Sequence, residues 1–255
     1  MAHRISLLFF LSACLMAAPC AAQLSFTGPN TNLITGFNTT GGIIPDAAGL
    51  PNFVGTNTNQ VSNTVTIVDS RIIDNVRFQI EDLTHTWVGD LVASVSHTGV
   101  NQFGVTDTVT ATLFERTGRE FDSNGNLSIP TTQGDSTDVD GDYFFRDDAV
   151  LANSPASADF SLVSDNLNIG AIPSGSYFAT DAADNVVNLD AIFAGRQAGG
   201  EWVLNLRDDG PRIRGEFGGF GVDILTQAPA VPEPASGIVL FTTTAVLFSL
   251  RRRRV

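Results

Sequence analysis

Short runs in which apolar and polar residues alternate are the feature that most constrains the fold of this 255-residue sequence. The clearest runs cover residues 73–80, 91–95, 109–113 and 202–206. A period of two places the apolar side chains on one face of an extended chain, so these runs predict β-strands that are buried on one side. Between the two termini, no stretch shows helical periodicity over three turns. The expected fold class is therefore all-β.

Turn residues separate the predicted strands. Gly89-Asp90 and Thr117-Gly118 are examples, and Asp208-Asp209-Gly210-Pro211 ends the run at 202–206. Glycine, proline and aspartate favour tight turns. Many short strands with turns at regular spacing are typical of a jelly roll or another β-sandwich. Residues 23–64 are rich in Thr, Asn and Gly, and we expect only part of this segment to form strands.

The first 22 residues predict a secretory signal peptide. Arg4 precedes an apolar stretch, and the small residues at 20–22 offer a cleavage site before Gln23. Two other interpretations stay open, a buried N-terminal helix and a lipoprotein signal in which Cys14 would be acylated. Both cysteines of the sequence lie in this segment. The mature chain would therefore have no disulfide framework, no thiolate zinc site and no cysteine nucleophile.

The last 25 residues predict a membrane anchor. Pro232-Glu233-Pro234 precedes an apolar run at 237–250, and the sequence then continues with Arg251, Arg252, Arg253 and Arg254. A helix of about 15 residues reaches only about 24 Å, so flanking residues would have to complete the span of a hydrocarbon core about 30 Å thick. The arginines would stay on the cytoplasmic side and leave the preceding residues outside.

This order of motif, short helix and arginine cluster resembles the PEP-CTERM sorting signal of Gram-negative bacteria. The resemblance implies that an exosortase, a membrane cysteine protease-transpeptidase, recognises Pro232, Glu233 and Pro234. It implies transient anchoring in the inner membrane, followed by release or transfer to the cell surface, and an association with exopolysaccharide production. An ordinary tail anchor is the alternative.

The segment between the two termini is strongly acidic. Residues 23–230 hold nine arginines and no lysine against 26 acidic residues, a net charge of −17. Such a surface repels phosphate backbones, so we exclude nucleic acid as a partner. Hydrophobic residues make up 43% of the sequence, which is enough for a packed core.

A longer pattern resembles the P/Homo B domain, the β-sandwich that follows the catalytic domain of proprotein convertases. The pattern begins at 73–91 and continues through 109–118, 145–149, 189–195 and 200–208. The resemblance assigns residues 65–226 to this domain. It implies a jelly roll of about eight strands in two sheets, similar to galactose-binding-like domains. The signature residues are Asp82, His85, Trp87, Gly89, Asp90, Trp202 and Asp208.

Asp82, His85 and Asp90 suggest catalysis or metal binding, because a histidine flanked by carboxylates can act as a base or a ligand. The interpretation that we favour is structural. Side chains at 82–86 would hydrogen-bond to local amides, and Gly89-Asp90 would form a turn. The two tryptophans, Trp87 and Trp202, would pack in the core. His97 has no acidic partner at a helical spacing, which argues against a zinc site.

The sequence does not encode a serine protease of its own. A subtilisin-type triad requires Asp, His and Ser on a separate catalytic domain, and only about 40 residues of the mature chain precede the P/Homo B-like segment. The sequence also lacks a Gly-x-Ser-x-Gly motif. Any peptidase activity would belong to an enzyme encoded elsewhere.

The most acidic segment, 135–148, suggests a calcium site. Asp138, Asp140, Asp142 and Asp147 supply carboxylate oxygens, and Gly141 supplies a turn. The spacing fits an EF-hand loop only in part, and flanking helices are not expected. The hypothesis is therefore a calcium site of another kind, with a solvated acidic loop as the alternative.

These patterns together predict an exported β-sandwich protein of the cell surface or extracellular matrix, without catalytic activity. One alternative is a carbohydrate-binding module that has extracellular polysaccharide as its partner. Another is a protease-associated P domain that assists an enzyme encoded elsewhere.

Overall fold

The computed structural model describes residues 32–46, 59–117, 136–147, 159–161, 170–210 and 213–227. The predicted signal peptide (1–22), which includes Cys14, lies outside the described residues. The predicted sorting signal (231–255) also lies outside them, with its Pro-Glu-Pro motif and its arginine cluster. No helix among the described residues combines the length and the hydropathy that a bilayer crossing requires.

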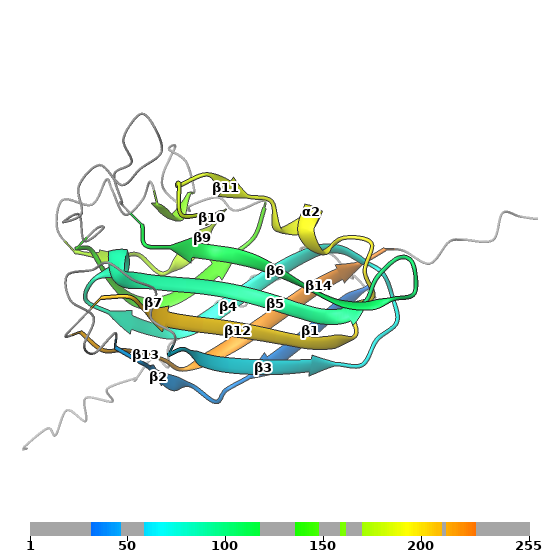
Figure 1. The fold of residues 1–255 in the computed structure, drawn as a ribbon, viewed down its shortest axis with the longest axis horizontal. Helices are drawn as coiled ribbons and strands as arrows, with labels where there is room; N and C mark the ends of the chain where they lie inside the picture. The colour runs from blue at the N-terminus through cyan, green and yellow to red at the C-terminus, as the bar shows by residue number, and fades with distance from the viewer. Residues whose placement is uncertain are drawn as a thin grey trace, which may run out of the picture. The chain divides into compact units, whose positions relative to one another are not determined.

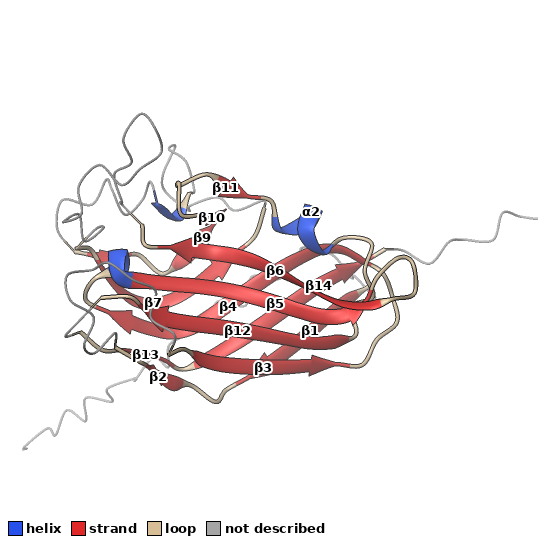
Figure 2. Ribbon diagram, viewed as in Figure 1, coloured by secondary structure: helices blue, strands red, loops and turns tan. Residues whose placement is uncertain are grey.

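Strands dominate the described chain, and the all-β prediction is confirmed (Figure 2). The four alternating runs lie in β4 (Ile73–His85), β5 (Leu91–Val100), β6 (Thr106–Glu115) and β12 (Gly200–Asp208). In β12 Trp202, Leu204 and Leu206 are fully buried, whereas Val203 and Asn205 between them are only partly buried. Burial on one face thus accounts for the alternation in the sequence.

The other elements complete two main sheets and a short hairpin (Figure 1). They are β1 (Leu33–Asn38), β2 (Gly42–Ile44), β3 (Val61–Ile67), the 3-10 helix η1 (Val88–Asp90), β7 (Asp138–Phe145), β8 (Ala171–Ile172), β9 (Gly175–Tyr177), β10 (Ala179–Thr180), β11 (Val186–Val187), helix α2 (Leu189–Phe193), β13 (Gly215–Phe217) and β14 (Gly219–Thr226).

We call the two main sheets the large sheet and the small sheet. The large sheet has the order β1-β14-β4-β13-β2, and β7 pairs with β4 and carries β8 and β9 in parallel. The small sheet has the antiparallel order β3-β12-β5-β6. The short strands β10 and β11 pair with each other. The predicted N-terminal segment thus contributes β1 and β2 to the large sheet and the start of β3 to the small sheet.

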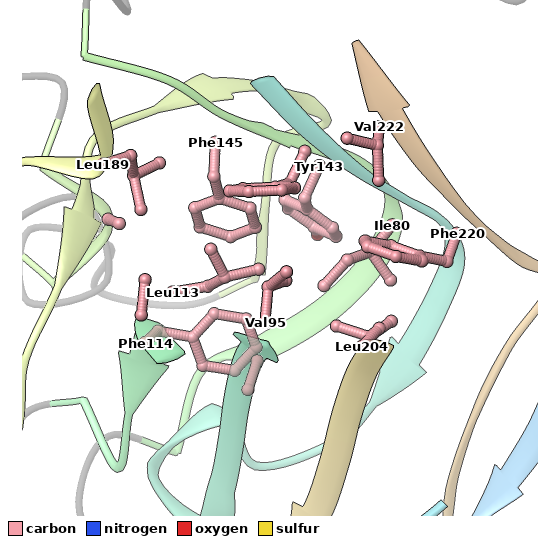
Figure 3. Close-up of a cluster of buried hydrophobic side chains, with 14 of the residues drawn as sticks. Ile80, Val95, Leu113, Phe114, Tyr143, Phe145, Leu189, Leu204, Phe220 and Val222 are labelled. Carbon is pink, nitrogen blue, oxygen red and sulfur yellow. The ribbon is translucent and has the colours of Figure 1, made fainter. Parts of the chain in front are cut away.

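Side chains from both sheets meet in one hydrophobic core (Figure 3). Tyr143, Phe145 and Phe220 belong to the large sheet, whereas Leu113 and Leu204 belong to the small sheet. Aromatic contacts cross between the sheets at two places. The ring centroids of Phe78 and Trp202 are 5.8 Å apart, and those of Phe114 and Phe145 are 5.7 Å apart. The apolar faces of the two sheets therefore shield each other from water.

The strands of the two sheets finish at two ends, which we name by one residue each. The Asp90 end holds the last residues of β4 and β12, the first residues of β5 and the helix η1, because Asp208 of β12 pairs with Leu91 of β5. The Gln227 end holds the first residues of β4, the last residues of β14 and the turn between β5 and β6. Here the Gln227 amide donates to the carbonyl of Ile72.

Candidate functional site

A group of buried ionisable side chains at the Asp90 end is the candidate site. His85 comes from the end of β4, Asp90 from η1, Asp208 and Asp209 from the end of β12, and Arg116 from the residue after β6. All five are less than 5% exposed. Buried charged groups are uncommon unless they are paired, so the partners of each decide what the cluster can do.

His85 is held from both sides of its ring. The Trp87 amide donates to Nδ1 at 3.0 Å, and Nε2 lies 3.1 Å from Oδ2 of Asp208. Because Nδ1 accepts a hydrogen bond, the proton of the neutral ring sits on Nε2 and is donated to Asp208. The side chains of His85 and Asp208 are both inaccessible to solvent. No ring nitrogen of His85 is left to act on a substrate.

Asp208 joins this histidine to the following turn. Its Oδ1 accepts the Gly210 amide at 2.8 Å, while its Oδ2 accepts from His85. Burial raises the pKa of the Asp208 carboxyl, and the hydrogen bonds from His85 and Gly210 oppose that rise. The carboxylate thus fixes the turn after β12 against the end of β4.

Asp90 lies against the same turn. Its backbone carbonyl accepts the Asp209 amide at 2.8 Å, and a Cβ added to Gly210 would lie 1.9 Å from its Oδ2. Its Oδ1 has no hydrogen-bond partner among the described residues. Burial, together with the negative charge of Asp208, raises the pKa of Asp90 from 3.8 to about 7.

Arg116 supplies a buried positive charge to the cluster. It has a φ of +47°, and its Nε donates to the carbonyl of Gly89 at 3.3 Å. The Nη2 atom of its guanidinium has no hydrogen-bond partner among the described residues. The charge of Arg116 opposes the rise in the pKa of Asp90, and Asp209 pairs with Arg207 at 3.0 Å. Positive charge therefore offsets part of the repulsion among the three carboxyl groups.

The predicted constellation of Asp82, His85 and Asp90 is divided by the structure. His85 and Asp90 join the cluster, but Asp82 is exposed and has a φ of +47°. It lies in a bulge of β4, where the register against β7 shifts between Ile80 and Leu83. The Asp82 amide donates to the carboxylate of Asp142 at 3.0 Å.

The two tryptophans differ. Trp202 is fully buried, as predicted. Trp87 is half-buried, so the prediction that it packs in the core was wrong. The reason is local: β4 ends at His85, and Trp87 is the N-cap of η1, outside any strand that would point it inward. Gly89 is buried in η1, and its carbonyl serves as the acceptor for Arg116.

The four aspartates of the predicted calcium site are not gathered. Asp138, Asp140 and Asp142 lie along strand β7, and the described residues contain no group of three or more His, Cys, Asp or Glu placed to hold a metal ion. Asp147 has a different role, because its two carboxylate oxygens accept the amides of Leu189 and Asp190 at 2.9 and 2.8 Å. These bonds hold the first turn of α2.

Sequence reasoning missed two members of the cluster, Arg116 and Asp209. Arg116 follows the apolar pair Leu113-Phe114, and a charged residue directly after a buried strand is a weak signal for a buried ion. Asp209 belonged to a predicted turn, where aspartate needs no further explanation. Gly89, which accepts from Arg116, and Asp90, which accepts from the Asp209 amide, lie far from them in the sequence.

Comparisons with known proteins add little to these observations. No family model matches the sequence, and no curated protein matches it. The crystal structure of the Aeromonas sobria serine protease (ASP) in complex with the chaperone (ORF2) is similar, with 14% identity and a TM-score of 0.33. The match covers 79% of this chain and 28% of that one. A crystal structure of the serine protease of Aeromonas sobria has 13% identity and a TM-score of 0.31, with coverages of 78% and 28%.

Proposed function

We propose that this chain is an exported protein that is anchored in the inner membrane by residues 231–255 and then transferred by an exosortase to the cell surface or extracellular matrix. Its body is a jelly-roll β-sandwich of the P/Homo B type without catalytic activity. The order Pro-Glu-Pro, apolar run and arginine cluster supports the sorting step. The closed hydrogen bonding of His85 supports the absence of catalysis.

The observation that carries the non-catalytic role is the arrangement around His85. A general base needs a free ring nitrogen within reach of the group that it deprotonates. Both nitrogens of His85 have partners inside the protein, and its side chain is inaccessible to solvent. The His85–Asp208 pair therefore resembles part of a triad in composition, yet its geometry fits a structural clamp between β4 and β12.

Labelling with a fluorophosphonate probe tests the absence of serine-hydrolase activity. We expect no labelled residue and no cleavage of general peptide substrates by the purified chain. Labelling of one serine that disappears when this serine is replaced by alanine would overturn this part of the proposal. His85→Gln is the matched variant. Replacement of a catalytic histidine would abolish any labelling, whereas replacement of a structural histidine would lower the stability of the fold.

Localisation tests the sorting step. In a host that makes the exosortase, Glu233→Ala should accumulate as a full-length membrane form, and a chain that ends at Ala230 should be secreted without retention at the surface. The body is the same in both chains, so a difference between them reports on the tail alone. Mass spectrometry of the surface form should find the arginine cluster removed. Its retention would refute the sorting proposal.

A second candidate function, carbohydrate binding, is favoured by the outer face of the small sheet. Serine and threonine occupy the outward positions of three of its four strands, and we call these residues the hydroxyl face. They are Ser62, Thr64 and Thr66 of β3, Ser94, Ser96 and Thr98 of β5, and Thr108, Thr110 and Thr112 of β6.

The outer face of the small sheet has few charged residues, although the mature chain is strongly acidic; they are Glu115 of β6 and Glu201 and Arg207 of β12. The strand between its rows, β12, presents Glu201, Val203, Asn205 and Arg207 on this side. Ser96 and Thr110 form a hydrogen bond of 2.8 Å across β5 and β6. Hydroxyl groups both donate and accept hydrogen bonds, so they suit the hydroxyl groups of an uncharged polysaccharide.

Affinity electrophoresis in gels that contain neutral hydroxyethylcellulose tests this second candidate. We expect retardation of the native chain, which Thr64→Val, Ser96→Ala and Thr110→Val together should remove. The control is Thr35→Val, which changes an exposed threonine of β1 in the large sheet. Equal mobility of all chains with and without the polymer would exclude the hydroxyl face as a binding surface.

A further inference from the structure

The turn between β5 and β6 exposes apolar side chains on a support of fixed shape. Phe103 at the turn is 79% exposed and Val105 is 55% exposed. Turns usually carry polar residues at such positions. An exposed phenylalanine beside an exposed valine makes this turn a candidate contact surface.

Asn101 fixes the shape of this turn. Its Oδ1 accepts the amides of Phe103 and Val105 at 2.9 and 3.1 Å, and its Nδ2 donates to Asp107 at 3.1 Å. Gly104 has a φ of +77°, which glycine adopts without strain. Phe103 is thus held outward by a fixed backbone, and its exposure is built into the turn.

A third apolar side chain lies at the same end of the sheet. Val68, directly after β3, is 97% exposed. The end of β3 and the end of β5 meet here, because Gly200 of β12 pairs with both Ile67 and Gly99. We call Val68, Phe103 and Val105 the apolar tip.

The apolar tip lies at the Gln227 end, and Figure 1 shows the turn between β5 and β6 at the same end of the sheets as the end of β14. In the sequence, the predicted anchor follows Gln227. Residues 228–236 separate Gln227 from the apolar run that begins at Gly237. Nine residues span at most about 30 Å when fully extended. An inserted tail would therefore hold Gln227 within about 30 Å of the lipid, and the apolar tip lies at the same end of the sheets as Gln227.

The charges around the apolar tip also fit a lipid surface. The mature chain has a net charge of −17 and is repelled by anionic headgroups. At this end, however, Asp69 is paired with Arg71 at 2.8 Å, and Asp107 is paired with Arg196. These two ion pairs reduce the negative charge beside the apolar tip, while Glu201 of β12 and Asp74 of β4 stay exposed at this end.

We propose that the apolar tip rests on the lipid surface while the tail holds the chain in the membrane, with Phe103 inserted among the headgroups. This inference rests on the anchoring step of the proposed function. Three side chains bury too little apolar area to bind a membrane alone. The tail supplies the high effective concentration that makes this weak contact persist.

Site-specific fluorescence tests the contact. In a full chain with Cys14 and Cys20 replaced by alanine, Phe103→Cys is labelled with nitrobenzoxadiazole and the chain is reconstituted into phosphatidylcholine vesicles. The matched control is Ile43→Cys, which is 62% exposed on β2 at the Asp90 end. We expect a blue shift and quenching by spin-labelled lipid at position 103 and neither effect at position 43. Equal spectra at the two positions would overturn the inference.

Flotation of the same vesicles separates this inference from the anchoring proposal. If the chain floats with the vesicles while the label at 103 stays in water, anchoring stands and the contact of the apolar tip is refuted. If the chain does not float, the anchored state does not exist and both proposals fail. Phe103→Asp, with the label moved to Val105→Cys, should lose the blue shift and still float.

Discussion

The ring of His97 lies over the indole of Trp202, with centroids 4.0 Å apart and planes 13° from parallel. Both side chains are fully buried. His97 Nε2 lies 3.3 Å from the carbonyl of Gly199, and the indole N–H of Trp202 donates to the carbonyl of Ala198 at 3.1 Å. His97 therefore serves as an aromatic residue of the core, and the two rings join β5 to β12.

This burial makes His97 sensitive to acid. Burial lowers the pKa of His97 from 6.5 to about 4, so the folded state binds fewer protons than the unfolded state between these values. His97 therefore costs stability as the pH falls from 6.5 toward 4. We expect His97→Phe, which keeps a stacked ring, to gain about 2 kcal/mol of unfolding free energy relative to the native chain on going from pH 7 to pH 5. Urea unfolding at both pH values measures the difference, and a constant difference would contradict the prediction.

The effect of Asp90 on stability has the opposite pH dependence to that of His97. Its pKa is raised from 3.8 to about 7, so between these pH values the folded state binds a proton that the unfolded state has released. The bound proton stabilises the folded state, and this stabilisation is lost as the pH rises from 3.8 through 7. Asp90→Asn keeps a neutral side chain at every pH. We expect this variant to gain about 2–4 kcal/mol over the native chain at pH 8 compared with pH 4. Asp74→Asn, at an exposed position of β4, controls for the loss of one negative charge. Equal behaviour of the two variants would show that burial of Asp90 has no effect.

Gly210 should be intolerant of a side chain because of Asp90. A Cβ at position 210 would lie 1.9 Å from Oδ2 of Asp90, and overpacking of this kind costs about 1–3 kcal/mol. We expect Gly210→Ala to destabilise the native chain by this amount and to cost less in an Asp90→Ala background. Thermal unfolding of the two single variants and the double variant gives the coupling energy. If the free-energy changes of the two single variants simply add up in the double variant, the cost of Gly210→Ala does not come from contact with Asp90.

Asp208→Asn should weaken the clamp between β4 and β12. Each carboxylate oxygen of Asp208 accepts a hydrogen bond, one from His85 and one from Gly210. An asparagine offers one acceptor oxygen and one donor group, so one of these two donors would lose its partner. An unsatisfied buried donor costs about 1–3 kcal/mol. Urea unfolding at pH 7 checks this cost, and a fully stable variant would show that the two hydrogen bonds are dispensable.

The strands could be predicted from the sequence because burial on one face leaves a local trace. Val76, Phe78 and Ile80 alternate and are all buried. The bulge at Asp82 then shifts the phase, so that Leu83 and His85 point inward in place of Asp82 and Thr84. Alternation alone does not place such a bulge, because one residue with positive φ changes the phase without changing the composition.

The candidate site could be predicted only in part. The P/Homo B resemblance includes His85, Asp90 and Asp208 among its signature residues. What brings them together is the pairing of β12 with β5 over nine residues, a relationship between segments more than 100 positions apart. The expected calcium ligands are not gathered, because strand β7 spreads Asp138, Asp140 and Asp142 along its length and Asp147 accepts from helix α2, which lies far from it in the sequence. Composition does not reveal either outcome.

The position of β14 sets the order in which this protein can be completed. The last strand lies between β1 and β4, so the large sheet stays split until residues 219–226 have joined it. A chain still emerging from the ribosome has no hydrogen-bonded partner for β1 until this strand arrives. The large sheet can therefore close only after synthesis has passed residue 226, which places its closure among the last steps of folding.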